Sequence, residues 1–324
     1  MVQLNSKDTD IFRVLSSGAT SYLDIVLILE KVYKYTIIKE KGEIGDRSSE
    51  AGEMEKHRPG RKRFAGTNEK QITSKGLKNR LSELKREGYI VSDIYPRSDG
   101  PGVFALYALT PLSMAELINQ GYDNNWIRSN LPKLNFIAHD KIVTETVRAI
   151  KREAGRTGYD FGIVDENRLR EMYIKGNRSK ALYPDLFVRI TLHAGSEQIT
   201  KRLNIEIDNN TLRPEAIADK VKKLDHKTII LCTNMQRIES LRRTFTAVLN
   251  QEERDRIFRY KHGKSRGKGV EKKDLPLEKK VMFALANDFH NNGLLRTNFI
   301  SVDNDPVCII EPEFKKKIAI SLKA

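Results

Sequence analysis

The sequence has few cysteines and no long apolar run. Only Cys232 and Cys308 occur among its 324 residues, and neither has partners at the spacing of zinc ligands. We therefore expect no disulfide framework and a reducing cytoplasm. The first residues, MVQLNSKDTDIF, lack the charged-then-apolar build of a secretory signal, and no stretch is apolar enough to span a membrane. No membrane partner is expected.

Negative charge is also scarce relative to positive charge. The formal net charge is +15 and the sequence pI is about 9.6. Such an excess indicates a polyanionic partner, most simply nucleic acid. An acidic membrane surface is the weaker alternative, because no strongly apolar amphipathic helix is present. With 39% apolar residues, the chain can build ordinary cores and is long enough for two domains.

The N-terminal part has the pattern of a winged helix-turn-helix. Apolar stripes predict helices over 8–17 and 22–35, and Thr73 is a good N-cap for a third helix, which a hairpin follows over 89–109. The pattern predicts a DNA-binding domain over 1–122 with the Thr73 helix in the recognition position. A winged helix that binds protein is the alternative. The expected DNA contacts of this helix are Lys75, Lys78, Asn79 and Lys85.

Two polar, basic segments interrupt the periodic pattern. The first is an insertion at about 41–68, and the second is a loop at about 259–273 with seven Lys or Arg and one Glu. Flexible basic segments bind phosphates and do not read base edges, so we expect non-specific DNA contacts from them. Solvated loops without a partner are the alternative. The residues expected to contact DNA are Arg61, Lys62, Arg63, Lys264, Arg266 and Lys268.

The composition shifts after a polar linker expected over 123–135. Helical spacing follows over 139–152, and strand-like runs come at 161–164, 186–192, 203–207 and 228–233. Helical spacing returns between the last two runs and again over 237–249. This alternation predicts a mixed α/β domain over 136–324.

Acidic residues stand at the ends of two neighbouring strands of this second domain. Asp185 comes just before the run 186–192, while Glu206 and Asp208 close the run 203–207 on one face. A carboxylate at a buried strand end is costly unless it is paired or bound to a metal.

A lysine follows on the next helix. Its apolar stripe is Ile217, Val221 and Leu224, and Lys220 falls within that stripe. Three acids and one inward lysine predict a Mg²⁺ or Mn²⁺ site with a charged assistant. The alternative is a surface hairpin with solvated acids and a lysine whose ammonium group reaches water.

Several short motifs support a family resemblance. They are Gly88-Tyr89-Ile90, Tyr107-Ala108-Leu109-Thr110, Pro184-Asp185, Glu206-Ile207-Asp208-Asn209-Asn210-Thr211, and Lys220 in a helix. With these motifs most of the chain resembles the replication-relaxation proteins of plasmids and integrative elements, which include the MOBC class of mobilisation relaxases. The resemblance implies an α+β protein of two domains, a winged helix-turn-helix and a restriction-endonuclease-like nuclease with a PD-(D/E)xK-type site.

The resemblance also implies roles for individual residues. Asp185 is the strand acid, Glu206 the second acid, Lys220 a lysine that has moved from strand to helix, and Glu166 an acid upstream of the motif. Asp208 stands where commoner nucleases of this fold carry lysine. Asp185, Glu206 and the Ile207 carbonyl would hold Mg²⁺ or Mn²⁺, with Asp208 as a direct or outer ligand.

The implied function is a metal-dependent DNA nickase or relaxase at an origin-like site in double-stranded DNA. Its partners would be a second copy of the chain or mobilisation and replication accessory proteins. Relaxase chemistry by tyrosine and a histidine triad is not expected, because the six histidines are widely scattered. A non-catalytic replication or copy-control factor and a transcription regulator with a degenerate nuclease domain are the alternatives.

Overall fold

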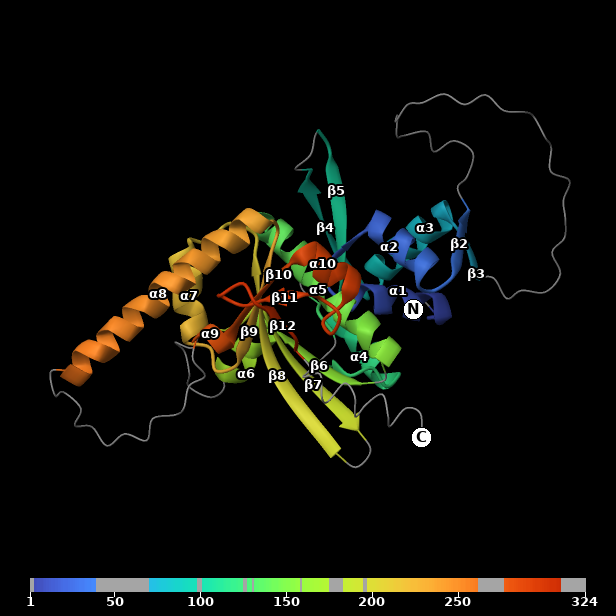
Figure 1. Cartoon of the computed structure of the whole chain (residues 1–324). Helices are drawn as coiled ribbons and strands as arrows, with labels where there is room; N and C mark the ends of the chain where they lie inside the picture. The colour runs from blue at the N-terminus through green and yellow to red at the C-terminus, as the bar shows by residue number, and fades with distance from the viewer. Residues whose placement is uncertain are drawn as a thin grey trace, which may run out of the picture. The chain divides into compact units, whose positions relative to one another are not determined.

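The chain folds into a mixed α and β structure with several sheets (Figure 1). The computed structural model describes residues 3–38, 70–97, 101–124, 127–129, 131–157, 159–174, 183–194, 197–261 and 277–309. Two compact units result, Met1–Tyr122 with Ser129–Leu131, and Asp123–Arg128 with Pro132–Ala324. Within the described ranges, no helix is long and apolar enough to cross a membrane.

Unit 1 combines four helices with a three-stranded antiparallel sheet and a two-stranded parallel one. The helices are α1 (Ser6–Leu15), α2 (Tyr22–Lys31), α3 (Ser74–Arg86) and α4 (Pro111–Asn119). The larger sheet has the order β1-β5-β4, from β1 (Thr20–Ser21), β5 (Val103–Leu109) and β4 (Ile90–Pro96). The smaller sheet pairs β2 (Tyr35–Ile38) with β3 (Lys70–Thr73).

Side-chain caps and apolar stripes explain where the helices of unit 1 begin and how they pack. Asn5, Ser21 and Thr73 each accept a backbone N–H at the start of α1, α2 and α3. The apolar stripes of the three helices are buried; their residues are Ile11, Phe12, Leu15, Ile25, Leu29, Leu77, Leu81 and Leu84.

One expected helix of unit 1 is shorter than its sequence pattern. The spacing predicts a helix over 22–35, but α2 ends at Lys31 and Tyr35 opens strand β2. Lys34 has a positive φ of 59°, which breaks the helical path. The Tyr35 hydroxyl donates to Asp10 of α1 at 3.0 Å, so a long-range contact holds the strand where local propensity favoured helix.

Unit 2 is built on a seven-stranded sheet of order β12-β11-β10-β9-β8-β7-β6. Strands β6 to β8 are antiparallel neighbours, β8 to β10 are parallel, and the last two strands are antiparallel. The bounds are β6 (Asp160–Asp165), β7 (Leu186–Ala194), β8 (Glu197–Asp208), β9 (Lys227–Cys232), β10 (Val281–Leu285), β11 (Phe299–Ile300) and β12 (Pro306–Val307).

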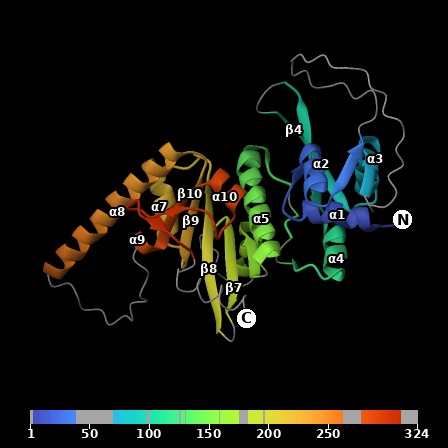
Figure 2. The ribbon, with the colours of Figure 1, turned by 45° about the vertical axis from the view of Figure 1, so that its right-hand side comes forward.

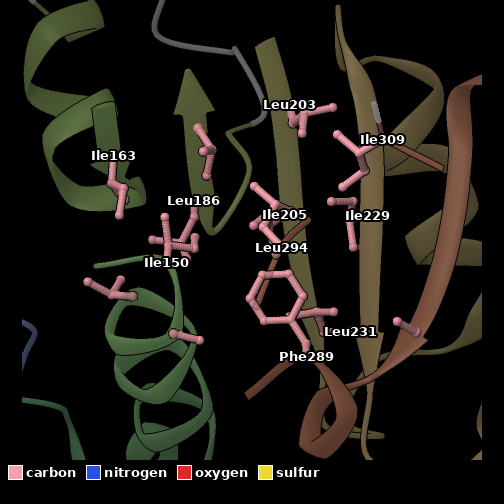
Figure 3. Packing of buried hydrophobic residues seen from close by; sticks show 14 of the residues in the cluster. Ile150, Ile163, Leu186, Leu203, Ile205, Ile229, Leu231, Phe289, Leu294 and Ile309 are labelled. Atoms are coloured by element: carbon pink, nitrogen blue, oxygen red, sulfur yellow. The ribbon is translucent and has the colours of Figure 1, made fainter. Parts of the chain in front are cut away.

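Helices cover both faces of this sheet, as the turned view shows (Figure 2). One face carries α5 (Ile137–Thr157) and α10 (Ala286–Asn292), and the other carries α7 (Pro214–Lys222) and α8 (Met235–Lys261). The shorter helices are η2 (Leu134–Phe136), α6 (Glu166–Ile174) and α9 (Leu277–Lys280). Figure 3 shows the core on the first face, where Ile150 of α5, Ile205 of β8 and Phe289 of α10 pack together.

The directions of the strands bring the ends of several strands together along one edge of the sheet, the edge formed by the carboxyl ends of its parallel strands. Strands β6, β8, β9 and β10 all end there, and β7 begins there. In open α/β sheets the carboxyl ends of the strands are the usual place for a ligand site. The acidic residues at the strand ends lie at this edge.

Candidate functional site

The polar residues at the end of β8 face the α7 and α8 side of the sheet. Side chains at 203, 205 and 207 join the core shared with α5. By the two-residue period, Asn204, Glu206 and Asp208 point to the opposite face, and all three are buried. Asn204 donates to the His226 carbonyl. The two buried carboxylates, Glu206 and Asp208, also need partners, because burial of an unpaired charge is costly.

Asp185, Glu206 and Lys220 come together at this edge. Leu186 pairs with Ile205, so Asp185 lies beside Glu206 on the neighbouring strand. The Lys220 Nζ atom reaches over from α7, 2.6 Å from Glu206 Oε2 and 3.9 Å from Asp185 Oδ1. The ammonium group therefore lies against both carboxylates.

Two further contacts hold the Asp185 carboxylate. The backbone N–H of Ile207 donates to Asp185 Oδ2 at 2.7 Å. The Nε2 atom of His139, in the first turn of α5, lies 3.5 Å from Asp185 Oδ1. His139 and Lys220 belong to helices on opposite faces of the sheet, so Asp185 is approached from both sides.

The electrostatics of the pair differ between the two acids. Burial raises the pKa of Glu206 to about 8, and the Asp185 charge adds to this effect more than the Lys220 charge offsets it. Burial also raises the pKa of Asp185, but the contacts with His139, Lys220 and the Ile207 N–H outweigh it, so the pKa lies below its usual value. One carboxylate is held ionised while its neighbour retains a proton more readily.

The donor set suits a hard divalent cation. The Glu206 Oε1 atom is buried and has no hydrogen-bond partner. Across the described residues, no group of three or more His, Cys, Asp or Glu could hold a metal ion. Magnesium commonly takes only one or two protein carboxylates and completes its shell with water and phosphate oxygens. Asp185 and Glu206 provide that number, and the unpartnered Oε1 atom is available as a ligand.

Asp208 is directed elsewhere. The Arg237 side chain of α8 donates from Nε to Asp208 Oδ2 at 2.5 Å and from Nη2 to Oδ1 at 3.2 Å. Arg237 also donates to the Leu212 carbonyl, and so fastens the loop that leads into α7. Arg237 is therefore the side chain that pairs with Asp208 in the structure.

Glu166 lies at the rim of the edge. Its N–H donates to the Asp185 carbonyl at 3.1 Å, but its carboxylate pairs with Arg170 one turn along α6. The negative charge of Glu166 raises the pKa of both Glu206 and Lys220. The family resemblance assigns the Ile207 carbonyl to the metal; the contact that the structure shows for the Ile207 backbone in this site is the N–H that donates to Asp185 Oδ2.

An arginine from the segment before α5 supports the same edge. Arg128 donates to Asp140 at 2.7 Å and to Asp165 at 3.1 Å, and the three side chains are at most 16% exposed. Asp140 follows His139 in sequence, and Asp165 precedes Glu166. The segment 123–128 is thus tied to unit 2, although it falls within the stretch that composition marks as a linker.

Sequence reasoning did not select His139 or Arg237. His139 lies four residues before Val143 of the buried α5 stripe, and this spacing was the available signal. Arg237 donates its N–H to the Asn234 side chain at the start of α8, a capping pattern that is readable from sequence. Its pairing with Asp208 depends on the β8–β9 register, which the sequence does not show.

The raised pKa of Glu206 predicts a pH-dependent stability. An acid whose folded pKa exceeds its ordinary value binds more protons when folded, so the free energy of unfolding falls as pH rises from about 4.5 to about 8. Glu206→Gln removes this fall. We expect the variant to gain melting temperature relative to wild type between pH 5.5 and 8.5, by at least about 2 °C. Parallel melting curves across this range would contradict the assignment.

The residues expected to bind DNA divide into two sets. Lys75, Lys78, Asn79 and Lys85 are exposed on α3. The Lys78 ammonium lies 5.4 Å from the ring centre of Tyr22 on α2. The other set, Arg61, Lys62, Arg63, Lys264, Arg266 and Lys268, lies outside the described residues.

The chain matches no family model, no curated protein and no solved structure.

Proposed function

We propose that the protein is a DNA-binding protein of a plasmid or mobile element that nicks DNA at an origin-like site with Mg²⁺ or Mn²⁺. In this proposal it belongs with the replication-relaxation proteins, unit 1 is the winged helix-turn-helix, and unit 2 is a PD-(D/E)xK-type nuclease. The observation that carries the proposal is the convergence of Asp185, Glu206 and Lys220 at one sheet edge.

The three residues divide the chemistry of phosphodiester hydrolysis among them. Asp185 and Glu206 would hold the divalent ion, which lowers the pKa of a bound water and offsets charge on the phosphate. Lys220 lies 2.6 Å from Glu206 Oε2, and its flexible stem lets the ammonium group turn to a phosphate oxygen once the carboxylates have another cation. There it would stabilise the charge that grows in the transition state.

The proposal requires that DNA reach the site from this end of the sheet. Asp185 lies directly before the start of β7, Lys220 reaches over it from α7, and the side chain of Lys220 is 19% exposed. The site is therefore a partly open edge and not a closed core. A duplex is too wide for a buried cavity but can approach an edge.

Unit 1 supports the DNA-binding half of the proposal. Helices α1 to α3 precede the β4–β5 hairpin, which is the element order of a winged helix. The buried stripe Leu77, Leu81 and Leu84 turns the opposite face of α3, with its lysines, to solvent. The net charge of +15 favours a polyanionic partner.

Removing lysines from α3 tests this surface. We expect Lys75→Ala and Lys78→Ala each to weaken DNA binding and to reduce the slope of log affinity against log salt by roughly one. Fluorescence anisotropy at several salt concentrations measures both quantities. Lys31→Ala on α2 removes the same charge from another helix and is the control. Unchanged slopes in both α3 variants would overturn the placement of α3 on DNA.

The second candidate is a replication or copy-control factor that binds DNA without cutting it. The observation that favours it is the Lys220–Glu206 pair itself, because such a pair can be a purely structural ion pair. In this alternative Lys220 stays paired with Glu206, and neither residue takes part in a reaction. The two readings differ in whether a divalent cation binds and DNA is cut.

The deciding experiment is a nicking assay in two steps. The DNA site is first selected by binding of Glu206→Gln to fragments of the DNA that flanks the coding gene. A supercoiled plasmid with that site is then incubated with wild-type protein and Mn²⁺, or with EDTA. Open-circular product with Mn²⁺ alone supports the nickase. No product on the selected site leaves the copy-control factor as the conclusion.

A further inference from the structure

His139 lies nearer to one oxygen of Asp185 than Lys220 does. Its Nε2 atom is 3.5 Å from Oδ1, and Lys220 Nζ is 3.9 Å from the same atom. Lys220 is much closer to Glu206, at 2.6 Å, so Glu206 is its main partner. The other oxygen of Asp185 accepts the Ile207 N–H. His139 therefore adds a third contact to those that this carboxylate makes with Lys220 and the Ile207 N–H.

The position of His139 on α5 makes this contact independent of Lys220. Helix α5 packs on the first face of the sheet through Val143, Val147 and Ile150, whereas α7 packs on the opposite face. Next to His139, Asp140 is bound by Arg128, which anchors the first turn of α5. A movement of Lys220 toward DNA would leave the His139 contact in place.

We propose that His139 is a positioning residue that holds the Asp185 carboxylate in the orientation needed to bind a divalent cation together with Glu206. This inference rests on the proposed function and extends it to a residue on the other face of the sheet. His139 itself binds neither the ion nor the DNA; it acts by donating from Nε2 to Asp185. Residues that orient metal ligands commonly change metal affinity by about 10- to 100-fold when they are replaced.

Three variants of the full-length protein test the role. His139→Leu removes the donor but keeps an apolar side chain, and His139→Gln keeps an N–H donor near the position of Nε2. His226→Leu is the matched control, because its ring packs on Phe187 and makes no contact with the two acids. Mn²⁺ affinity is measured by titration calorimetry without DNA, and the nicking rate is measured in parallel.

The expected result is a loss of about 10- to 100-fold in Mn²⁺ affinity for His139→Leu, with His139→Gln within a few-fold of wild type. His226→Leu should bind Mn²⁺ as wild type does. Wild-type affinity in His139→Leu would overturn the proposal. An equal loss in the Leu and Gln variants would also overturn it, because that pattern means packing and not donation.

A measurement on the metal-free protein tests this inference separately from the proposed function. The Ile207 amide proton is bound to Asp185 Oδ2, so its NMR chemical shift reports how the carboxylate is held. We expect a clear change in this shift in metal-free His139→Leu and recovery in His139→Gln. If wild-type protein neither binds Mn²⁺ nor nicks DNA, the nickase proposal fails, and an unchanged Ile207 shift shows separately that His139 does not position Asp185.

Discussion

Glu206→Gln is expected to abolish Mn²⁺-dependent nicking while specific DNA binding persists. The substitution keeps the side-chain shape but removes a ligand charge at the atom that has no other partner, Oε1. Loss of several kcal/mol of metal-based stabilisation corresponds to a fall of roughly 10³-fold in rate. Binding to DNA without metal should be unchanged, or slightly tighter above about pH 8, where wild-type Glu206 has a negative charge that the variant lacks.

The matched control is Glu215→Gln, an exposed acid in the first turn of α7. It makes the same chemical change on the helix that carries Lys220. Nicking of the selected plasmid should be as in wild type. If Glu206→Gln nicked as fast as Glu215→Gln, the carboxylate of Glu206 would have no part in the reaction, and the assignment of the site would fail.

Arg80→Met is expected to lower the free energy of unfolding of unit 1 by about 3–5 kcal/mol. Arg80 donates from Nε and Nη2 to the two oxygens of Asp8, at 2.7 and 2.6 Å. The Asp8 side chain is fully buried, so removal of Arg80 leaves a buried charge without its partner. Hydrogen exchange of α3 peptides measures the loss, and β9 peptides of unit 2 serve as an internal reference.

Two further variants show whether the unpaired charge is the cause. Arg86→Met, on the same helix, removes an arginine that is 71% exposed and should cost at most about 1 kcal/mol. Asp8→Asn combined with Arg80→Met should recover part of the stability, because no buried charge remains. If the double variant were less stable than Arg80→Met alone, the loss would come from packing of the arginine stem.

Local sequence patterns predicted many helices and strands, because buried apolar residues recur with the period of the element that contains them. Thr73 was expected to cap a helix, and it does so at the start of α3. The β-branched runs that end near Leu192 and Ile207 are the neighbouring strands β7 and β8. The strand β10 (Val281–Leu285) does not show this two-residue period. Four of its five residues are buried, so alternation disappears.

The sequence predicted the candidate site only within single helices and strands, and not the contacts between them. The strand period placed Glu206 and Asp208 on one face of their strand, and the helical stripe placed Lys220 on the inner face of its helix; the structure then shows that these two faces meet. The partner of Asp208 was not accessible, because Arg237 reaches it through the packing of α8 on the sheet. His139 comes from a helix on the other face, and no local period connects that helix to Asp185.

The ion pairs of Arg128 with Asp140 and Asp165 determine where the chain can be divided for separate study. A fragment that starts at residue 136, after the stretch with linker-like composition, contains Asp140 and Asp165 but not the guanidinium group that both acids bind. A fragment that starts before Asn124 keeps Arg128, and also the Asn124 carbonyl that accepts from Arg168. Trimming by a protease between these two points would therefore cost unit 2 part of its own support, at the edge where α5 and α6 begin.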